Sequence, residues 1–128
     1  MKIDLTPDVL DLVLYAGDGV RFRLVITDSA EAPVNITGTV KAQVRDKRGE
    51  VDLTPEGEFA VDLTDAATGI VVLSLTGAQT QDLYDNWIAL FPTAKKFIGV
   101  WDVEWTPSGA EPRTLCQGKV ECGPDVTR

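Results

Sequence analysis

The strongest constraint on the fold is a run near the C-terminal end, FIGVWDVEW at residues 97–105, in which large apolar and acidic residues alternate. Successive side chains of a β-strand point to opposite faces of a sheet. Trp101, Val103 and Trp105 therefore share one face, and Asp102 and Glu104 share the other. This alternation predicts a strand with one buried and one solvated face, as in an antiparallel sheet that packs on a core.

Similar runs recur along the chain, with turn signals between them. They predict seven strands, at residues 9–19 (with its turn), 20–28, 38–50 (with a turn at 46–49), 58–65, 69–76, 97–105 and 113–122. The predicted inward faces carry Val20, Phe22, Leu24 and Ile26, then Val40, Ala42 and Val44, then Phe59, Val61 and Leu63, while Arg21, Arg23, Lys41 and Arg45 face outward. The run 69–76 is apolar enough to suit a strand covered on both faces.

One segment, TGAQTQDLYDNWIALF at residues 76–91, has a different period. Thr76 and Gln79 have the spacing of a capping box. Leu83, Trp87 and Leu90 recur at helical intervals, and the proline that follows ends the run. The sequence therefore predicts one short helix near residues 77–91 that crosses an open end of the strands, with Trp87 plugging the core.

Together these elements predict a mainly β protein, a two-layer antiparallel β-sandwich. The absence of strand–helix–strand repeats argues against a parallel sheet. A length of 128 residues predicts a single domain over 1–128. Short tails, MKIDLTPD and GPDVTR, are expected to leave the sandwich and to clasp neighbouring subunits.

The charge of −8 is unevenly distributed. Residues 49–94 contain eight acids and no lysine or arginine, and the remaining twelve acids balance the twelve bases. Such a surface repels phosphates, so we expect no nucleic-acid binding. It serves either as a solvated face or as a docking surface for a basic partner. No run has the ~20 apolar residues of a membrane span, and no signal peptide opens the chain, so we expect no membrane contact and folding in a cytoplasm.

The sequence predicts no catalytic, cofactor-binding or metal site. It has no histidine, which excludes histidine-based triads and histidine-ligated metals. The GDG at residues 17–19 is a turn and not a phosphate loop. Asp102 and Glu104 lie on a solvated strand face with nothing to desolvate them, and the acidic pairs at 62–65 and 82–85 lack the ligand density of a calcium loop.

The two cysteines, Cys116 and Cys122, lie six residues apart in one predicted strand. Six extended residues span about 20 Å, whereas a disulfide needs Cα atoms within about 7 Å. We therefore expect two free thiols that act as small apolar core residues.

Trp101 and Trp105 allow two interpretations. If the two rings are exposed, they form a ladder on which sugars can stack. If they are buried, they form a stripe of the core. The acidic residues between them mark the opposite face as the wet one, which favours the core, with Trp105 near the end of the sandwich as the more exposed ring.

Three segments resemble a known family. YAGDGVRFRLVITDSAEAPVNITGTVKAQVRDKRG resembles the opening of a phage protein family related to the N-terminal domain of baseplate upper proteins, through its Gly17-Asp18 turn, Thr27-Asp28, residues 33–38 and Arg45-Asp46. VDLTDAATGIVVLSLTGAQTQDL and VWDVEWTPSGAEPRTLCQGKVECGPDVTR are similar to its later turn, helix start and terminal strand pair. The resemblance covers residues 14–128.

This resemblance implies an immunoglobulin-like sandwich that is a structural component of a virion, without enzymatic activity or cofactor. The expected location is the tail or baseplate, or the capsid surface as a decoration or minor capsid protein, after assembly in the host cytoplasm. The expected partners are other phage structural proteins and further copies of the chain in a symmetric assembly. The alternative is a carbohydrate-binding β-sandwich module for host attachment, which the exposure of Trp87, Trp101 and Trp105 would distinguish.

Overall fold

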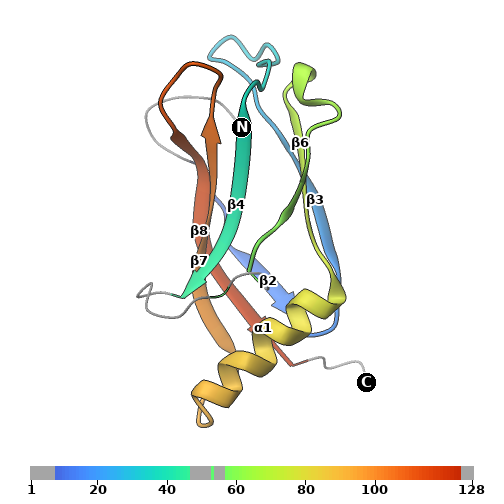
Figure 1. Ribbon diagram of the computed structural model, residues 1–128, viewed down its shortest axis with the longest axis vertical. Coiled ribbons are helices and arrows are strands. Elements are labelled where there is room, and N and C mark those ends of the chain that lie inside the picture. The colour runs from blue at the N-terminus through green and yellow to red at the C-terminus, as the bar shows by residue number, and fades with distance from the viewer. Residues whose placement is uncertain (1–7, 47–52, 54–56, 125–128) are drawn as a thin grey trace.

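Two β-sheets face each other in the computed structural model of the chain, and the helix α1 crosses one end of them (Figure 1). The structure describes residues 8–46, 53 and 57–124. The elements are β1 (Asp8–Val9), β2 (Leu12–Tyr15), β3 (Val20–Val25), β4 (Thr39–Asp46), β5 (Ala60–Asp62), the 3-10 turn η1 (Ala66–Thr68), β6 (Ile70–Leu75), α1 (Gly77–Leu90), β7 (Phe97–Thr106) and β8 (Arg113–Gly123). The mainly β, two-layer prediction with one helix is confirmed.

The larger sheet has the order β1-β8-β7-β4, with β2 also beside β8. β7 pairs antiparallel with β8, as predicted for the terminal strand pair, and also antiparallel with β4, for which no partner was predicted. β1 and β2 run parallel to β8, so the prediction of a wholly antiparallel sandwich is wrong for this pairing. Alternation fixes which side chains face the core, but it reads the same in both directions along a strand, so it carries no information about strand direction.

The smaller sheet has the antiparallel order β3-β6-β5. Val71, Leu73 and Leu75 of the central strand β6 are buried against the other sheet. Their neighbours Ile70 and Val72 face away from the core and are only half-buried. The prediction that this strand is covered on both faces is therefore wrong, because no further layer lies over the outside of the smaller sheet in the part of the chain that the structure describes.

The chain passes from one sheet to the other at residues 57–59. The backbone N–H of Val44 donates to the carbonyl oxygen of Gly57 at 2.6 Å, and the N–H of Phe59 donates to that of Ala42 at 3.0 Å. This segment therefore covers the free edge of β4 before β5 joins β6. An edge strand covered in this way offers fewer unpaired backbone groups to other chains.

Three aromatic rings hold the middle of the core together. Trp101 of β7, Phe22 of β3 and Phe59 at the crossing between the sheets lie with ring centroids 5.7 to 6.0 Å apart. Phe22 meets both neighbours edge-on, an arrangement that the ring quadrupoles favour. The predicted inward faces of 20–26, 40–44, 59–63 and 101–105 are confirmed, since their apolar residues all form or contact this core.

The helix begins as predicted. The Thr76 hydroxyl accepts from the N–H of Gln79, whose side chain accepts from the N–H of Thr76, which completes the capping box. The helix ends at Leu90, before the proline. Leu83 and Trp87 contact the core as predicted, whereas Leu90 is 57% exposed and does not.

The packed stripe of this helix continues from Trp87 to Phe91 instead of Leu90. The Trp87 ring lies 4.5 Å from that of Phe91 and meets that of Phe97 edge-on at 4.9 Å. Residues four apart stay on one face of a helix, so Phe91 takes the place that a spacing of three assigned to Leu90.

Thr80 joins the helix to the turn between β2 and β3. This side chain is fully buried. Its hydroxyl accepts from the N–H of Gly17 at 3.1 Å and lies 2.9 Å from the carbonyl oxygen of Asp18, to which it donates. The Sγ of Cys122 lies 3.6 Å from the Thr80 carbonyl oxygen. One buried threonine therefore ties α1, the β2–β3 turn and the end of β8 together.

Three predicted boundaries need correction. Asp46 was assigned to a turn, but it is the last residue of β4 and is buried; residues 47–49 lie outside the described residues. Asp8 and Gly123 were assigned to the tails, but Asp8 pairs with Cys116 and Gly123 with Tyr15. These residues have the composition of turns and tails, but each pairs with a distant strand. The strands therefore extend further than composition predicts. The rest of the predicted tails, residues 1–7 and 125–128, lies outside the described residues.

Candidate interaction surface

The side of the larger sheet that faces away from the core is defined here as the outer face. Its outward side chains include Val9, Asp11, Val13, Tyr15, Lys41, Gln43, Arg45, Ile98, Val100, Asp102, Glu104, Gln117, Lys119 and Glu121. Four aliphatic members are solvent-exposed: Val9 at 73%, Val13 at 63%, Ile98 at 47% and Val100 at 36%. Exposed aliphatic groups that gather on one face of a sheet are a common mark of a protein–protein contact.

The strand register arranges these residues in rows across the sheet. One row holds Val13, Glu121 and Ile98 on β2, β8 and β7. The next holds Lys119 on β8 and Val100 on β7. Side chains directly opposite each other lie about 5 Å apart. Lys119 and Glu121 of β8 therefore have aliphatic neighbours on the adjacent strands. Along each of these two rows, apolar and charged side chains thus alternate from one strand to the next.

A local break in the first predicted strand gives this face its edge. The N–H of Leu10 donates to the carbonyl oxygen of Gln117 at 2.9 Å, and a carboxylate oxygen of Asp11 accepts from the N–H of Lys119 at 2.8 Å. A Cβ at Gly118 would meet the Leu10 carbonyl oxygen at 2.0 Å. Glycine therefore lets the backbone of the first strand dip toward the core between β1 and β2.

The side chain of Trp101 holds this dip in place from the core side. Its Nε1 donates to the carbonyl oxygen of Leu10 at 2.7 Å. The buried indole thus has its polar atom satisfied, and the N-terminal strand is held against β8 by a contact that is not part of the sheet ladder. β1 and β2 keep a single register with β8 on both sides of the dip, which places Val9 and Val13 on the same face.

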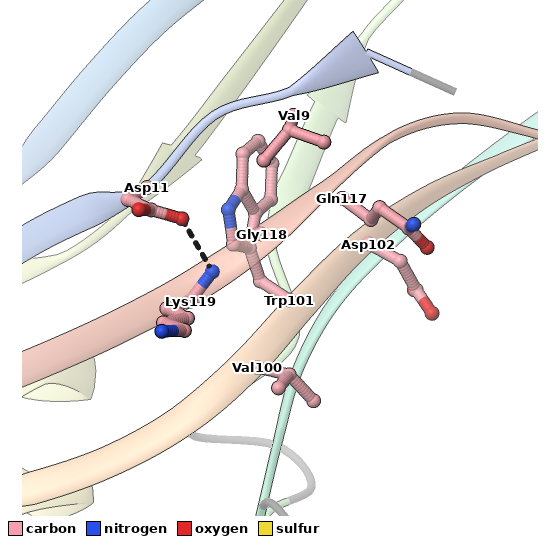
Figure 2. Close-up of a pocket in the computed structure, with 8 residues that line it drawn as sticks. All are labelled: Val9, Asp11, Val100, Trp101, Asp102, Gln117, Gly118 and Lys119. Carbon is pink, nitrogen blue, oxygen red and sulfur yellow. Dashed lines mark hydrogen bonds between the residues drawn. The ribbon is translucent and has the colours of Figure 1, made fainter. Parts of the chain in front are cut away.

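An open hollow of about 620 Å³ lies beside this dip, and its lining residues are drawn in Figure 2. It is lined by Val9, Asp11, Val100, Trp101, Asp102, Gln117, Gly118 and Lys119. Figure 2 shows Asp11 turned toward the backbone of Lys119, with Val9 above the indole. The indole N–H of Trp101 and a carboxylate oxygen of Asp11 are bonded within the chain, so these two polar groups of the lining are already occupied.

The charges of the outer face are largely paired within it. Lys96 lies 3.0 Å from Glu121, and Arg45 lies 3.6 Å from Asp102. Lys41 stands directly opposite Glu104 in the register of β4 and β7. Partial burial raises the pKa of the Asp102 carboxyl, which Arg45 opposes. These pairs are exposed to solvent, so each contributes little to stability, but together they fix a pattern of charge.

The tryptophan stripe predicted on β7 belongs to the core. Trp101 is 1% exposed and Trp105 is 5% exposed. The preference for a core stripe is therefore confirmed. Trp105 is the more exposed of the two rings, as expected, but it too is buried. Its Nε1 donates to the carbonyl oxygen of Thr37 at 2.6 Å, which closes that end of the sandwich. Neither ring is available to stack on a sugar.

The acidic residues considered for a calcium site, at 62–65 and 82–85, lie on different elements. Asp102, which was considered with Glu104 for acid–base chemistry, is partly buried, so the expectation that nothing desolvates it is wrong. Asp62 bonds to Thr64 through the side-chain hydroxyl at 2.6 Å and through the backbone N–H, and these bonds lower the pKa of its carboxyl. Asp82 and Asp85 lie on the exposed side of α1. Among residues 8–46, 53 and 57–124 there is no group of three or more His, Cys, Asp or Glu side chains that could hold a metal ion.

The two cysteines are free and fully buried, at opposite ends of the inward face of β8. They are small core residues in a continuous strand, as predicted. Burial raises the pKa of both thiols to about 11, and at Cys116 the nearby Asp8 carboxylate adds to the effect. A neutral, buried thiol is a poor nucleophile.

Sequence reasoning did not identify the outer face as a site, although part of the signal was present. The alternation that puts Asp102 and Glu104 outward also puts Ile98 and Val100 outward, because all four share one parity. Val9 and Val13 carry a weaker signal, because Asp11 shares their parity but the run is otherwise apolar and its facing depends on β8.

No protein-family model matches the chain, and no curated protein matches it in sequence. The helix of the described residues is neither long enough nor apolar enough to cross a membrane.

Proposed function

We propose that this protein is a non-enzymatic structural component of a bacteriophage particle that attaches to its neighbours through protein–protein contacts. The proposed location is the tail or baseplate, or the capsid surface as a decoration or minor capsid protein, reached after assembly in the host cytoplasm. The proposed partners are other particle proteins and further copies of the chain. The observation that carries the proposal is the outer face, with four exposed aliphatic side chains on a flat sheet.

The grouping of strands supports an immunoglobulin-like sandwich as the scaffold. If β1 and β2 together are strand A, the remaining strands in chain order are B to G. One sheet then contains B, E and D, and the other contains C, F and G with A beside G. Immunoglobulin-like domains divide B, E, D and C, F, G between their sheets in the same way. This architecture presents flat faces and edges to partners.

The chemistry of the outer face favours a protein partner over a sugar. Its exposed apolar groups are mainly aliphatic, whereas sugar binding relies on exposed aromatic faces. Trp101 and Trp105 are buried, and Trp87 packs on Phe91 and Phe97. The carbohydrate-binding alternative thus lacks the exposed ladder on which it depended.

The experiment that tests this function is a particle inventory. Virus particles are purified on a density gradient from lysed cells of the host that carries the gene, and the chain is quantified by mass spectrometry against the most abundant particle protein. We expect it to band with the particles at a fixed ratio that symmetry allows. If the chain stays in the soluble fraction while complete particles form without it, the proposal is wrong.

A further inference from the structure

We propose that the outer face binds the outer face of a second copy of this chain, about a two-fold axis that crosses the strands between the rows of Lys119 and Glu121. This inference rests on the outer face being the contact surface in the proposed function, and it names the partner. It is testable on the purified protein, so its failure is distinct from absence of the chain from particles.

The outer face carries no net charge, although the chain as a whole is acidic. The charged residues that stand on this face or pair along it are four bases and four acids: Lys41, Arg45, Lys96, Lys119, Asp11, Asp102, Glu104 and Glu121. Their sum is zero, while the whole chain carries −8. Two copies that meet through any strongly acidic surface repel each other. The outer face is where two copies can approach without net repulsion.

The order of the charges along β8 selects the direction of the axis. Lys119 and Glu121 are successive outward residues of one strand, with opposite sign. A two-fold axis across the strands between their rows places Lys119 of each copy opposite the partner's Glu121, and forms this pair twice. An axis along the strand would instead place Lys119 over the same residue of the other copy. Charge therefore selects the crossing axis, because like charges in close apposition are strongly unfavourable.

This axis also satisfies most of the apolar pattern. Val100 lies in the row of Lys119, and Ile98 lies in the row of Glu121. The axis places Val100 of each copy against the partner's Ile98. The next rows outward hold Val9 on one side and Tyr15 on the other, so these two also meet across the axis. Three of the four exposed aliphatic residues thus meet apolar groups, and an isologous contact repeats each pair, whereas Val13 faces the partner's Asp11.

The position of the axis limits the area of the contact. The axis lies near one end of the sheet, because β7 begins at Phe97 and β8 ends at Gly123. Residues 117–123 of β8 overlap with their symmetry copies, a length of roughly 23 Å at about 3.3 Å of rise per residue. Over three strands about 4.8 Å apart this gives roughly 300 Å² per copy before side-chain relief, which is less than the ~800 Å² of a stable interface. The dimer is therefore expected to be weak, and the test must reach high concentration.

The test exchanges the two β8 charges and follows the mass by sedimentation velocity over a wide range of concentration. The wild-type chain is expected to sediment at about twice its monomer mass of 13.9 kDa. Lys119→Glu places a carboxylate opposite the partner's Glu121, and Glu121→Lys places an ammonium opposite the partner's Lys119. Since each repulsion occurs twice, either variant is expected to raise the dissociation constant at least about tenfold.

Two combinations make the test specific to the axis. An equimolar mixture of Lys119→Glu and Glu121→Lys chains restores opposite charges at both contacts and is expected to recover the dimer as a heterodimer. The double variant carrying both changes is expected to dimerise like wild type. Arg23→Glu serves as the matched control, because it reverses the charge of an exposed base on β3, in the other sheet and away from the outer face. It is expected to keep the dimer.

A denaturant melt of each variant shows that the chain remains folded, so a loss of mass reports association alone. The proposal is overturned if the wild-type chain is a monomer throughout, or if both single variants dimerise as wild type does. It is equally overturned if the mixture stays monomeric, because the two charges are then not opposed across an axis. A loss of dimer in Arg23→Glu as large as in Lys119→Glu would also contradict it.

Discussion

The indole Nε1 of Trp101 donates a hydrogen bond to the carbonyl oxygen of Leu10, 91 residues earlier in the chain, at 2.7 Å. The bond crosses from the middle of β7 to the break between β1 and β2, over a glycine of β8. It links the core of the sandwich to the edge of the outer face. The first predictions concern this link.

Gly118→Ala is expected to destabilise the protein by about 1–3 kcal/mol, the usual cost of overpacking. Its Cβ would lie 2.0 Å from the Leu10 carbonyl oxygen and 2.6 Å from its carbon, so the first strand must move. Gly123→Ala, in the same strand, is the matched control, because nothing lies within 4 Å of its Cβ. Urea unfolding measures both, and equal stabilities would show that the first strand does not lie over Gly118.

Trp101→Ala is expected to cost about 3–5 kcal/mol in the free energy of unfolding, as other large-to-small core changes do. The ring is buried between Phe22 and Phe59. Trp101→Phe keeps an aromatic ring but removes the N–H, so we expect a smaller loss together with faster hydrogen exchange in β1 and β2. A loss below about 1 kcal/mol for Trp101→Ala would mean an exposed ring, since substitutions away from the core have small effects.

Thr80→Val is expected to cost about 1–3 kcal/mol, because the buried N–H of Gly17 loses its acceptor. Valine keeps the shape of the side chain and removes only the hydroxyl. Thr80→Ser, which keeps the hydroxyl and loses a methyl group, is expected to cost less. Thermal unfolding of the two variants decides the point, and the reverse order would show that packing rather than the hydrogen bond matters at this position.

Cys116 and Cys122 are expected to be unreactive thiols. Their burial is also expected to make the free energy of unfolding depend on pH in the alkaline range. Folding raises the pKa of each from 9.0 to about 11, so between these values the folded chain binds more protons than the unfolded chain. The free energy of unfolding must then fall as the pH rises from about 9 to about 11. The double variant Cys116→Ala/Cys122→Ala should lack this part of the pH dependence.

Intact-mass measurement after thiol labelling checks the redox state of the same two residues. Native protein should label slowly and unfolded protein should take up two labels. A mass two hydrogens lower without reductant would reveal an intramolecular bridge, and β8 would then not be a continuous strand.

The alternation of apolar and polar residues was enough to predict the faces of β3, β4 and β7, and the spacing of Thr76 and Gln79 was enough to predict the start of α1. These are local relationships, within about eight residues of chain. The parallel pairing of β1 and β2 with β8 was not predictable in this way, because it depends on strands at opposite ends of the sequence. β8 also contains a bulge opposite Val103 and Glu104, where both Leu115 and Cys116 are buried. This bulge was not predictable either, because it depends on the pairing with β7.

The candidate site was predictable only in part. The parity of β7 assigns Ile98 and Val100 to the outer face, and a reader of the sequence can see that two aliphatic residues precede the acidic ones there. The facing of Val9 and Val13 depends on the pairing of their strands with β8, and the dip at Leu10 depends on Gly118. Sequence alone does not connect these distant segments.

The central claim is that the protein acts in a particle through the outer face, and a competition for incorporation tests it most directly. Tagged wild-type chain is expressed in the host beside either Val100→Lys or Val25→Lys during infection, and the ratio of the two chains in purified particles is measured by mass spectrometry. Both valines are exposed strand residues, at 36% and 45%, but Val25 lies on the other sheet. We predict that Val100→Lys is depleted from particles while Val25→Lys is incorporated as well as wild type. Equal incorporation of Val100→Lys and wild type would contradict the claim.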